Sequence, residues 1–257
     1  MSIHTSAIIS ETARIADDVI IGPYSVIGAD VEIGAGTRVG SHVVINGPTT
    51  IGRENRIYQF ASVGDDPQDK KYADEATRLV IGDRNTIREY CTISRGTTQD
   101  RGETVLGSDN WIMAYVHVAH DCVVGDHCIM ANNTTLAGHV QVGDWVICGG
   151  FTGVHQFCRI GAHAFLGMYS IIGRDIPAYT MMGGQPTVPK GINSEGLKRR
   201  GFSAEQISNI KNAYRIVYRQ GKKLAEAIEE ITALAGSQPE LEILLESLRT
   251  SERGIVR

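Results

Sequence analysis

The chain has 257 residues, enough to bury a substantial core in one domain or two. Its formal net charge of −4 argues against a polycationic nucleic-acid-binding protein. The sequence has neither an N-terminal secretory signal nor an apolar run of about 18 residues, so we expect a cytoplasmic protein that does not insert into a membrane.

The dominant pattern is an apolar residue at every sixth position, which is typical of a β-helix built from stacked coils. It first runs without a miss through Ile3, Ile9, Ile15, Ile21, Ile27, Ile33, Val39, Ile45, Ile51, Ile57 and Val63. It returns at Ile81, Ile87 and Ile93 and then continues through Leu106, Ile112, Val118, Val124, Met130, Leu136, Val142, Cys148, Val154, Ile160, Leu166 and Ile172. Three hexads, about 18 residues, would close one triangular coil, and successive coils would stack as parallel strands about 4.8 Å apart. We therefore expect a prism with these residues pointing inward.

Glycine directly follows many of these apolar residues. We expect it to relieve crowding at the corners of the prism and to permit a positive φ there. The positions are Gly22, Gly28, Gly34, Gly40, Gly52, Gly82, Gly107, Gly125, Gly143, Gly161, Gly167 and Gly173.

The five cysteines form an odd set without a C-x-x-C pair. Cys128, Cys148 and Cys158 lie in or beside apolar positions of the repeat. The sequence therefore predicts buried, reduced thiols rather than disulfides.

Two interruptions of the repeat predict loops that leave the prism. In the first, the phase is kept but the inner positions become Asp69 and Glu75, so we expect residues 65–77 to loop out. In the second, the phase shifts by one residue, and we expect the polar segment 94–104 to leave the stack. Long loops on a rigid scaffold often carry function.

The repeat ends near Ile172 and is followed by Pro177, Pro186 and Pro189. We therefore expect a β-helix in residues 1–189 and a smaller α-helical domain in residues 190–257.

The sequence predicts three main helices in this second domain. Ser203 and Gln206 form a capping-box pattern, and the apolar face that follows ends at Gly221. This apolar face comprises Ile207, Ile210, Tyr214, Val217 and Tyr218. Two further helices are expected at residues 222–234 and 239–249. Residues 190–223 hold nine basic and two acidic side chains, a local basic patch.

The histidines indicate a functional site. Four of the eight lie close together in the sequence, namely His117, His120, His139 and His155. Because three hexads close a coil, positions 120, 138 and 156 fall above one another on three successive coils. A lone histidine is usually structural, but four that converge indicate chemistry. Asp121 follows His120 directly and can orient its imidazole.

A zinc site is an alternative, because the gamma-class carbonic anhydrases are also hexapeptide prisms. Their ligand spacing would match His127 and His163, but the third position is Met168. No nucleophile elbow, P-loop or dinucleotide fingerprint is present in the sequence.

Several segments occur in the order and form of one family of acyltransferases. They are His117-Val118-Ala119-His120-Asp121-Cys122, Gly138-His139-Val140, His155-Gln156-Phe157-Cys158, Pro67-Gln68-Asp69-Lys70-Lys71-Tyr72 and Asn193-Ser194-Glu195-Gly196-Leu197-Lys198-Arg199-Arg200-Gly201-Phe202. On these motifs the chain closely resembles the UDP-N-acetylglucosamine O-acyltransferases that begin lipid A synthesis in Gram-negative bacteria. The resemblance covers essentially the whole chain.

This resemblance implies a left-handed prism and a homotrimer with active sites between neighbouring prisms. The implied reaction moves an (R)-3-hydroxyacyl group from acyl carrier protein to the glucosamine 3-OH of UDP-N-acetylglucosamine, without a metal or other cofactor. His120 aligns with the general base, Asp121 assists it, and the Gly138 N–H aligns with the oxyanion donor. Implied sugar contacts are Asp69, Lys71, His117, His139 and His155, and Gln68 is a further implied substrate contact. Implied nucleotide contacts are Gln156, Asn193, Glu195, Arg199 and Arg200.

Met168 aligns with the residue that limits acyl-chain length in this family. A bulky side chain there implies a preference for a chain of roughly 10–12 carbons, since each buried methylene stabilises the complex by about 0.8 kcal/mol until the chain meets Met168. Two alternatives remain at this stage. One is the related N-acyltransferase of the same pathway, which has an extra N-terminal domain for which hexads beginning at Ile3 leave no room. The other is a non-catalytic scaffold, which would explain the repeat but not the histidines.

Overall fold

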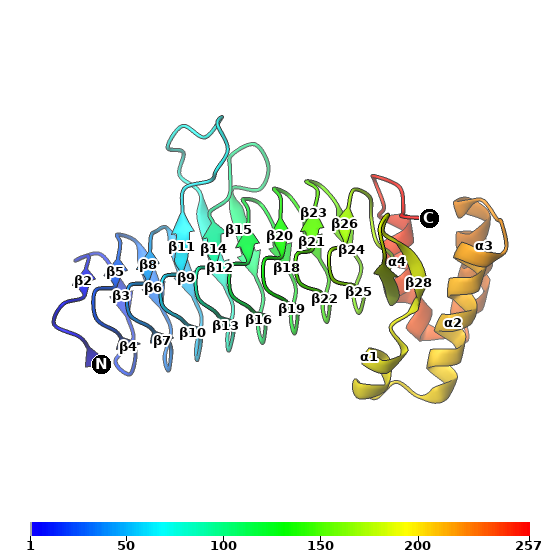
Figure 1. Cartoon of the computed structure of the whole chain (residues 1–257), viewed down its shortest axis with the longest axis horizontal. Helices are drawn as coiled ribbons and strands as arrows, with labels where there is room; N and C mark the ends of the chain where they lie inside the picture. Colours follow the sequence, from blue (N-terminus) through cyan, green and yellow to red (C-terminus); the bar gives the residue numbers. More distant parts are fainter. Residues whose placement is uncertain (1) are drawn as a thin grey trace.

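The computed structural model describes residues 2–257. Its main body is a left-handed parallel β-helix, a long prism of short strands, and α-helices follow at its C-terminal end (Figure 1). The predicted fold class is therefore confirmed.

Three sheets form the faces of the prism. Face A contains β1 (Ser2–Ile3), β4 (Ile20–Ile21), β7 (Arg38–Val39), β10 (Arg56–Ile57), β13 (Thr86–Ile87), β16 (Trp111–Ile112), β19 (Ile129–Met130), β22 (Ile147–Cys148), β25 (Phe165–Leu166), β27 (Thr180–Gly183) and β28 (Val188–Ile192). Face B contains β2 (Ile8–Ile9), β5 (Val26–Ile27), β8 (Val44–Ile45), β11 (Ser62–Asp65), β14 (Thr92–Ser94), β17 (His117–Val118), β20 (Thr135–Leu136), β23 (Gly153–Val154) and β26 (Ile171–Ile172). Face C contains β3 (Arg14–Ile15), β6 (Val31–Ile33), β9 (Thr49–Ile51), β12 (Arg78–Ile81), β15 (Glu103–Leu106), β18 (Val123–Val124), β21 (Gln141–Val142) and β24 (Arg159–Ile160).

The register of the strands follows the sequence repeat. Ile3 pairs with Ile21, and Ile21 pairs with Val39, so each of these coils is three hexads long. The spacing in sequence is wider between the paired residues Ile57 and Ile87, and again between Ile87 and Ile112. The additional residues form two loops, one between β11 and β12 and the other between β14 and β15, which project side by side from the prism (Figure 1).

The apolar residue of each hexad points into the prism. From Ile21 to Ile172 these side chains are at most 3% exposed, and they form one continuous cluster along the axis. Burying a single Ile or Leu stabilises the fold by about 1.5–3 kcal/mol. The prism is therefore held by its core over nearly its whole length.

The glycines of the repeat are needed for space and not for a positive φ. A Cβ on Gly22 would lie 2.7 Å from the carbonyl carbon of Gly40 in the next coil, which confirms the expected crowding. The expected positive φ is wrong. Left-handed backbone falls instead on the third residue after the inner position, such as Tyr24 (φ 58°), Asp121 (φ 58°) and His139 (φ 64°). The turn at the corner imposes this conformation even though it costs a non-glycine residue about 1–2 kcal/mol.

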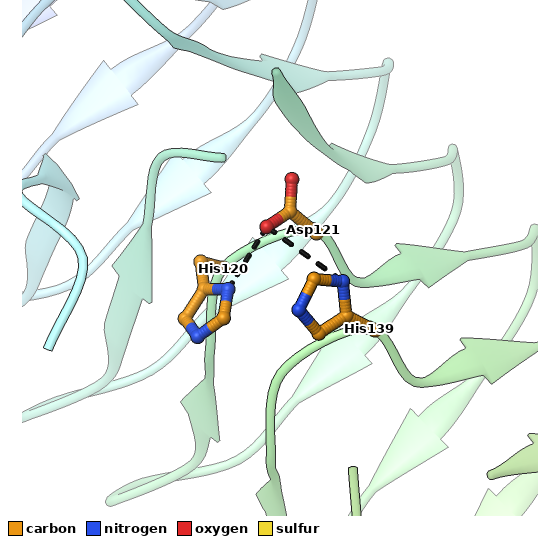
Figure 2. Close-up of side chains that lie close together, drawn as sticks. All are labelled: His120, Asp121 and His139. Atoms are coloured by element: carbon orange, nitrogen blue, oxygen red, sulfur yellow. Dashed lines mark hydrogen bonds and ion pairs between the residues drawn. The ribbon is translucent and has the colours of Figure 1, made fainter. Parts of the chain in front are cut away.

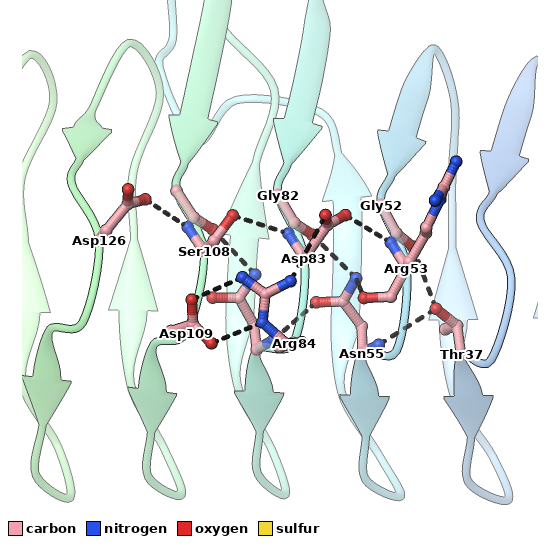
Figure 3. Close-up of polar contacts among 12 residues, drawn as sticks. Thr37, Gly52, Arg53, Asn55, Gly82, Asp83, Arg84, Ser108, Asp109 and Asp126 are labelled. Carbon is pink, nitrogen blue, oxygen red and sulfur yellow. Dashed lines mark hydrogen bonds and ion pairs between the residues drawn. The ribbon is translucent and has the colours of Figure 1, made fainter.

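Polar side chains close the corner between faces C and A (Figure 3). Asn55 accepts a hydrogen bond from the Asn85 N–H (2.9 Å) and donates to the Gly82 carbonyl oxygen (2.8 Å). Arg84 binds the Asp109 carboxylate with two nitrogens, at 2.8 and 2.7 Å. Corner backbone groups that have no strand partner are satisfied in this way.

The C-terminal segment folds as α1 (Ser194–Arg199), α2 (Ala204–Arg219), α3 (Leu224–Ala235), the 3₁₀ turn η1 (Pro239–Leu241) and α4 (Glu242–Arg249). The predicted capping box of Ser203 and Gln206 is confirmed, and the predicted apolar face of α2 is buried or half-buried. The last predicted helix differs, because its first three residues form η1. Pro239 at the start of η1 has no N–H to donate.

The helices pack on the end of the prism. Tyr179 is buried and its hydroxyl donates to the Glu240 carbonyl oxygen at 2.9 Å. Asp175 accepts hydrogen bonds from the Ser251 hydroxyl (2.8 Å) and from the Glu252 N–H (3.0 Å). These contacts fix η1 and the residues that follow α4 to the last coils.

All five cysteines are buried and unbridged, as predicted. Burial raises the pKa of Cys122 and of Cys128 to about 12, so these thiols are protonated at neutral pH. In the described part of the chain, none of the helices combines the length and apolar character that a membrane crossing requires.

Candidate active site

The histidine cluster lies at the corner between faces B and C. His120 follows β17, Gly138 follows β20 and Gln156 follows β23, so these three residues occupy equivalent positions in successive coils. The two projecting loops leave the prism at the neighbouring coils, between β11 and β15. The stacking predicted from the length of the coil is therefore present.

His120 and Asp121 form a directed pair (Figure 2). The Nδ1 atom of His120 lies 2.9 Å from Oδ2 of Asp121. Thr97 holds the same carboxylate, with its N–H at 3.0 and 3.1 Å from the two oxygens and its hydroxyl at 2.6 Å from Oδ2. An aspartate fixed in this way presents its Oδ2 atom to the imidazole.

Asp121 remains ionised in this setting. Burial by itself would raise the pKa of Asp121, but the hydrogen bonds from His120 and Thr97, with His139 nearby, lower it below its ordinary value. An ionised carboxylate at Nδ1 selects the tautomer of His120 that carries its proton on Nδ1. The lone pair is then on Nε2, where a general base needs it.

Gly138 lies directly against the imidazole of His120. A Cβ at residue 138 would lie 2.5 Å from Cε1 and 2.7 Å from Nε2 of His120. Within residues 2–257, no hydrogen bond uses the N–H of Gly138. A free backbone donor beside an imidazole is an arrangement that can stabilise an oxyanion.

His139 has a carboxylate partner that the sequence did not suggest. Its Nδ1 lies 2.9 Å from Oδ2 of Asp100, on the loop between β14 and β15, and 3.8 Å from Oδ2 of Asp121. Its ring stacks on Phe157 and meets the His120 ring edge-on, with centroids 5.0 Å apart. His139 is thereby held in one orientation beside His120.

In the described part of the chain, one group of side chains could hold a metal ion, namely His120, Asp121 and His139. Ligand atoms of His120, Asp121 and His139 lie within 4.8 Å of one another. The Nδ1 atoms of both histidines, however, face aspartate oxygens at 2.9 Å. A cation bound through these Nδ1 atoms would have to displace the hydrogen bonds that orient the two imidazoles.

The other two predicted histidines flank the cluster. His117 is half-buried on β17, and its Nδ1 lies 2.7 Å from the Thr92 hydroxyl. Burial, together with the nearby His120, lowers the pKa of His117, so its neutral form is favoured. His155 and Gln156 are exposed at the same corner, one coil beyond His139.

The first loop brings an acidic side chain close to His120. Asp69 lies with Oδ2 at 4.0 Å from Nε2 of His120, and its Oδ1 accepts a hydrogen bond from the Lys71 N–H at 3.0 Å. Gln68 and Lys71 are exposed on this loop. The structure thus unites the loop residues with the histidines.

Of the residues proposed for the nucleotide, Gln156 shares the corner of His120, and the others lie elsewhere in the same chain. Asn193 is buried, caps α1 and donates to the His163 carbonyl oxygen at 3.0 Å. Arg200 lies over the Trp145 ring, and its Nη1 donates to Nδ1 of His163 at 3.0 Å. His163 belongs to the corner between faces C and A, so these residues do not meet His120 within one chain. Exposed Arg199 and Glu195, the latter paired with a lysine, are on the same short helix.

The zinc alternative does not survive the geometry. Trp145 stacks against His127 on one side, with centroids 4.0 Å apart, and against His163 on the other, at 6.4 Å. The indole ring separates the two imidazoles, and His163 also accepts from Arg200. Within the described residues, His127 and His163 therefore share no metal position.

Met168 lies at the third corner, between faces A and B. Its residue surface is 64% exposed in the single chain. The adjacent Tyr169 stacks on Phe151 of the preceding coil, with centroids 5.1 Å apart. The proposed acyl-chain limit is thus an exposed edge and not part of the prism core.

Three residues of the site could not be named from the sequence, namely Thr97, Asp100 and Arg95. All three lie in the loop between β14 and β15. The loop itself was predicted, but loop residues have no periodicity from which a partner can be deduced. The one signal in the sequence was that the predicted loop contains threonine and aspartate, whose side chains can bind a histidine or its carboxylate partner.

Comparisons with known proteins agree with this geometry. Residues 175–256 match the family described as Udp N-acetylglucosamine O-acyltransferase; Domain 2. Residues 12–47 and 103–138 match the bacterial transferase hexapeptide family.

Full-length relatives carry one name. An acyl-(acyl-carrier-protein)–UDP-N-acetylglucosamine O-acyltransferase of Thiobacillus denitrificans is 62% identical over 256 residues, covering 100% of this chain and 99% of the relative. One from Ectopseudomonas mendocina is 59% identical with the same coverage. The solved structure of LpxA from Acinetobacter baumannii is 50% identical with a TM-score of 0.97, covering 99% of both chains. That of Moraxella catarrhalis UDP-N-acetylglucosamine O-acyltransferase is 50% identical with a TM-score of 0.98, covering 100% of both chains. With relatives this similar along its whole length, the chain belongs to the family of acyl-(acyl-carrier-protein)–UDP-N-acetylglucosamine O-acyltransferases.

Proposed function

We propose that this protein transfers an (R)-3-hydroxyacyl group from acyl carrier protein to the glucosamine 3-OH of UDP-N-acetylglucosamine, the first step of lipid A biosynthesis. The observation that carries the proposal is the oriented pair of His120 and Asp121 next to the free N–H of Gly138. Family membership supports the substrates, since the relatives are named for them.

His120 acts as the general base in this proposal. Its Nε2 removes the proton of the sugar hydroxyl as the oxygen attacks the thioester carbonyl, which contributes about 10²–10⁴-fold to the rate. Asp121 stabilises the resulting imidazolium, and the Gly138 N–H donates to the oxyanion of the tetrahedral intermediate. When the intermediate collapses, the C–S bond breaks and the imidazolium returns its proton to the leaving thiolate. No cofactor is needed for these steps.

The loop and the remaining histidines bind the sugar in this proposal. Asp69 is near enough to His120 to accept a hydrogen bond from a second sugar hydroxyl, beside the 3-OH that His120 deprotonates. Gln68, Lys71, His117, His139 and His155 complete the set proposed to contact the sugar.

The nucleotide is assigned mainly to residues of α1 and its two caps. Arg199 and Arg200 are permanently charged and suit a diphosphate, because a guanidinium offers two parallel donors. Gln156, Asn193 and Glu195 complete the proposed contacts.

We propose that the working unit is a homotrimer. His120, Arg200 and Met168 lie at three different corners of one prism, so one chain does not surround one substrate with all of them. A rotational arrangement of three chains would bring a different corner of each neighbour to each site. Acyl carrier protein would dock near the basic segment 190–223, and the protein would act in the cytoplasm.

We also propose that residues 1–189 and 190–257 form separate domains. A second buried cluster, formed mainly by helical residues such as Ile210, Ile231 and Leu245 and joined by Ala178 and Tyr179, supports this division. The strand β28 spans the proposed boundary.

The alternatives weighed from the sequence have less support. Relatives of this chain at 57–62% identity are named as O-acyltransferases and not as N-acyltransferases. A scaffold would have no need of a buried aspartate that orients a histidine.

The direct test is mass spectrometry of the product formed from UDP-N-acetylglucosamine and a mixture of 3-hydroxyacyl carrier proteins of different chain length. We expect an ester at the 3-OH with roughly 10–12 carbons, since Met168 would shorten the acyl site by the length of several methylenes. Absence of any acylated sugar nucleotide would contradict the proposed function.

A further inference from the structure

Arg95 is a buried cation at the base of the second loop. The residue is 8% exposed and directly follows β14. Its Nη1 donates to the Gly64 carbonyl oxygen at 2.7 Å, and its Nη2 donates to the Tyr72 hydroxyl at 3.0 Å and pairs with Asp66. All of these partners belong to the first loop or to the strand that enters it.

Such a guanidinium is expensive to bury. Removing a charge from water costs several kcal/mol unless its donors are used, and an apolar side chain of similar volume stabilises a fold at least as well. Nε of Arg95 has no hydrogen-bond partner among residues 2–257, so the burial is incompletely compensated. Stability alone therefore does not account for an arginine at this position, whereas geometry does.

The contacts of Arg95 lead to the base in three steps. Tyr72, held by Arg95, donates its backbone N–H to the Asp69 carbonyl oxygen at 3.0 Å. The Lys71 N–H donates to Oδ1 of Asp69 at 3.0 Å, which turns the other carboxylate oxygen toward His120. That oxygen, Oδ2, lies 4.0 Å from Nε2 of His120.

We propose that Arg95 is a positioning residue for the acyl transfer, because it holds the first loop so that Asp69 stays beside His120. The inference rests on the proposed function, in which Asp69 holds the sugar so that its 3-OH meets His120. Arg95 itself touches no substrate; it acts through Tyr72 and Asp69.

A double-mutant cycle tests this route. Arg95→Lys keeps the charge but loses the planar fork that reaches several acceptors. We expect kcat/KM for UDP-N-acetylglucosamine to fall about 10- to 100-fold, the size of effect expected when a reacting group is misplaced by about 1 Å. In an Asp69→Ala background the same change should cost less than about threefold, because its route of action has been removed.

Two further variants control the cycle. Arg101→Lys alters an exposed arginine on the same loop and should leave kcat/KM unchanged. Tyr72→Phe removes the hydroxyl that accepts from Arg95 and donates to the Glu75 carbonyl oxygen at 3.2 Å. It should lower kcat/KM about fivefold, again only when Asp69 is present. Tryptic cleavage after Lys70 and Lys71 should become faster in Arg95→Lys and not in Arg101→Lys.

An Arg95→Lys effect of equal size with and without Asp69 would overturn the proposal, as would an unchanged kcat/KM. If Arg95→Lys does not fold, the Tyr72→Phe cycle decides by the same criterion. The proposed function fails on a different result, namely an inactive wild-type protein.

Discussion

The imidazole of His120 packs directly against Gly138 and needs a glycine there, since a Cβ at residue 138 would lie 2.5 Å from Cε1 of that ring. Neither group can move far, because His120 is bound to Asp121 and Gly138 is part of a prism corner. The same glycine presents an unused N–H. One small residue thus serves both the base and the proposed oxyanion site.

Gly138→Ala should therefore lower kcat about 100-fold or more, because the methyl group displaces the His120 ring from its productive position. The fold should persist, since the change lies at an edge of the prism. Steady-state kinetics and a thermal melt check both points. Gly236→Ala is the matched control, because a Cβ there meets nothing within 4 Å. An active Gly138→Ala enzyme would contradict the proposed role of His120.

Thr97→Val should lower kcat about 10-fold. The change removes the hydroxyl that donates to Oδ2 of Asp121 at 2.6 Å but keeps the backbone N–H bonds. A hydrogen bond to a charged group contributes about 1.5–3 kcal/mol, and part of this orients the carboxylate toward His120. Thr98→Val, an exposed neighbour, should behave as wild type in the same assay. Equal rates in both variants would show that Thr97 does not act through Asp121.

His120→Ala should lose at least about 99% of the activity, given the 10²-fold minimum for a general base. His120 is nearly buried but contributes nothing to the apolar core, so the melting temperature should change little. His155→Ala should reduce activity less, because His155 is exposed and bonds only to its neighbour Gln156. A His120→Ala rate above a tenth of wild type would rule out the general-base assignment.

The pH dependence of stability should report on His163. The pKa of His163 is lowered from an ordinary value of 6.5 to about 4, mainly by burial and to a smaller extent by the charge of Arg200. Between these values the unfolded chain binds a proton that the folded chain does not, so stability is greatest above pH 6.5 and falls as the pH decreases toward 4. The loss can reach about 3 kcal/mol.

Urea unfolding at a series of pH values measures this slope. The variant His163→Gln should give a flatter profile between pH 6.5 and 4 than the wild type. Parallel profiles would assign the acid sensitivity between pH 6.5 and 4 to other groups. Asp121 is not among them, because its pKa is lowered from an ordinary value of 3.8 and its contribution is lost only below that pH.

The prism could be predicted from the sequence in detail because its period depends on burial alone. Ile21 and Leu166 are inward for the same reason, and the three-hexad coil brings residues 120 and 138 together. The positive φ was misplaced, because the glycine beside Ile21 is selected for contact with the next coil and not for the turn.

The loops and the assembly could not be predicted in the same way. Thr97 and Arg95 reach Asp121 and Tyr72 through folds of the loop that follow no repeat. His120 and Arg200 lie apart because they are at different corners of the prism. The order of the motifs in the sequence does not reveal this.

Acyl-chain length is the property that should depend on Met168. Its exposed side chain would occupy the length of three or four methylenes in a groove that a neighbouring chain completes, and each buried methylene is worth about 0.8 kcal/mol. Met168→Gly should therefore shift the preferred 3-hydroxyacyl chain from roughly 10–12 carbons to one about four carbons longer, with relative kcat/KM changing about 10-fold or more. Met168→Leu keeps the bulk and should keep the wild-type profile. Competition between carrier proteins loaded with different chains, followed by mass spectrometry of the products, measures the profile. If Met168→Gly and Met168→Leu gave the same chain-length distribution as the wild type, Met168 would be a packing residue between prisms.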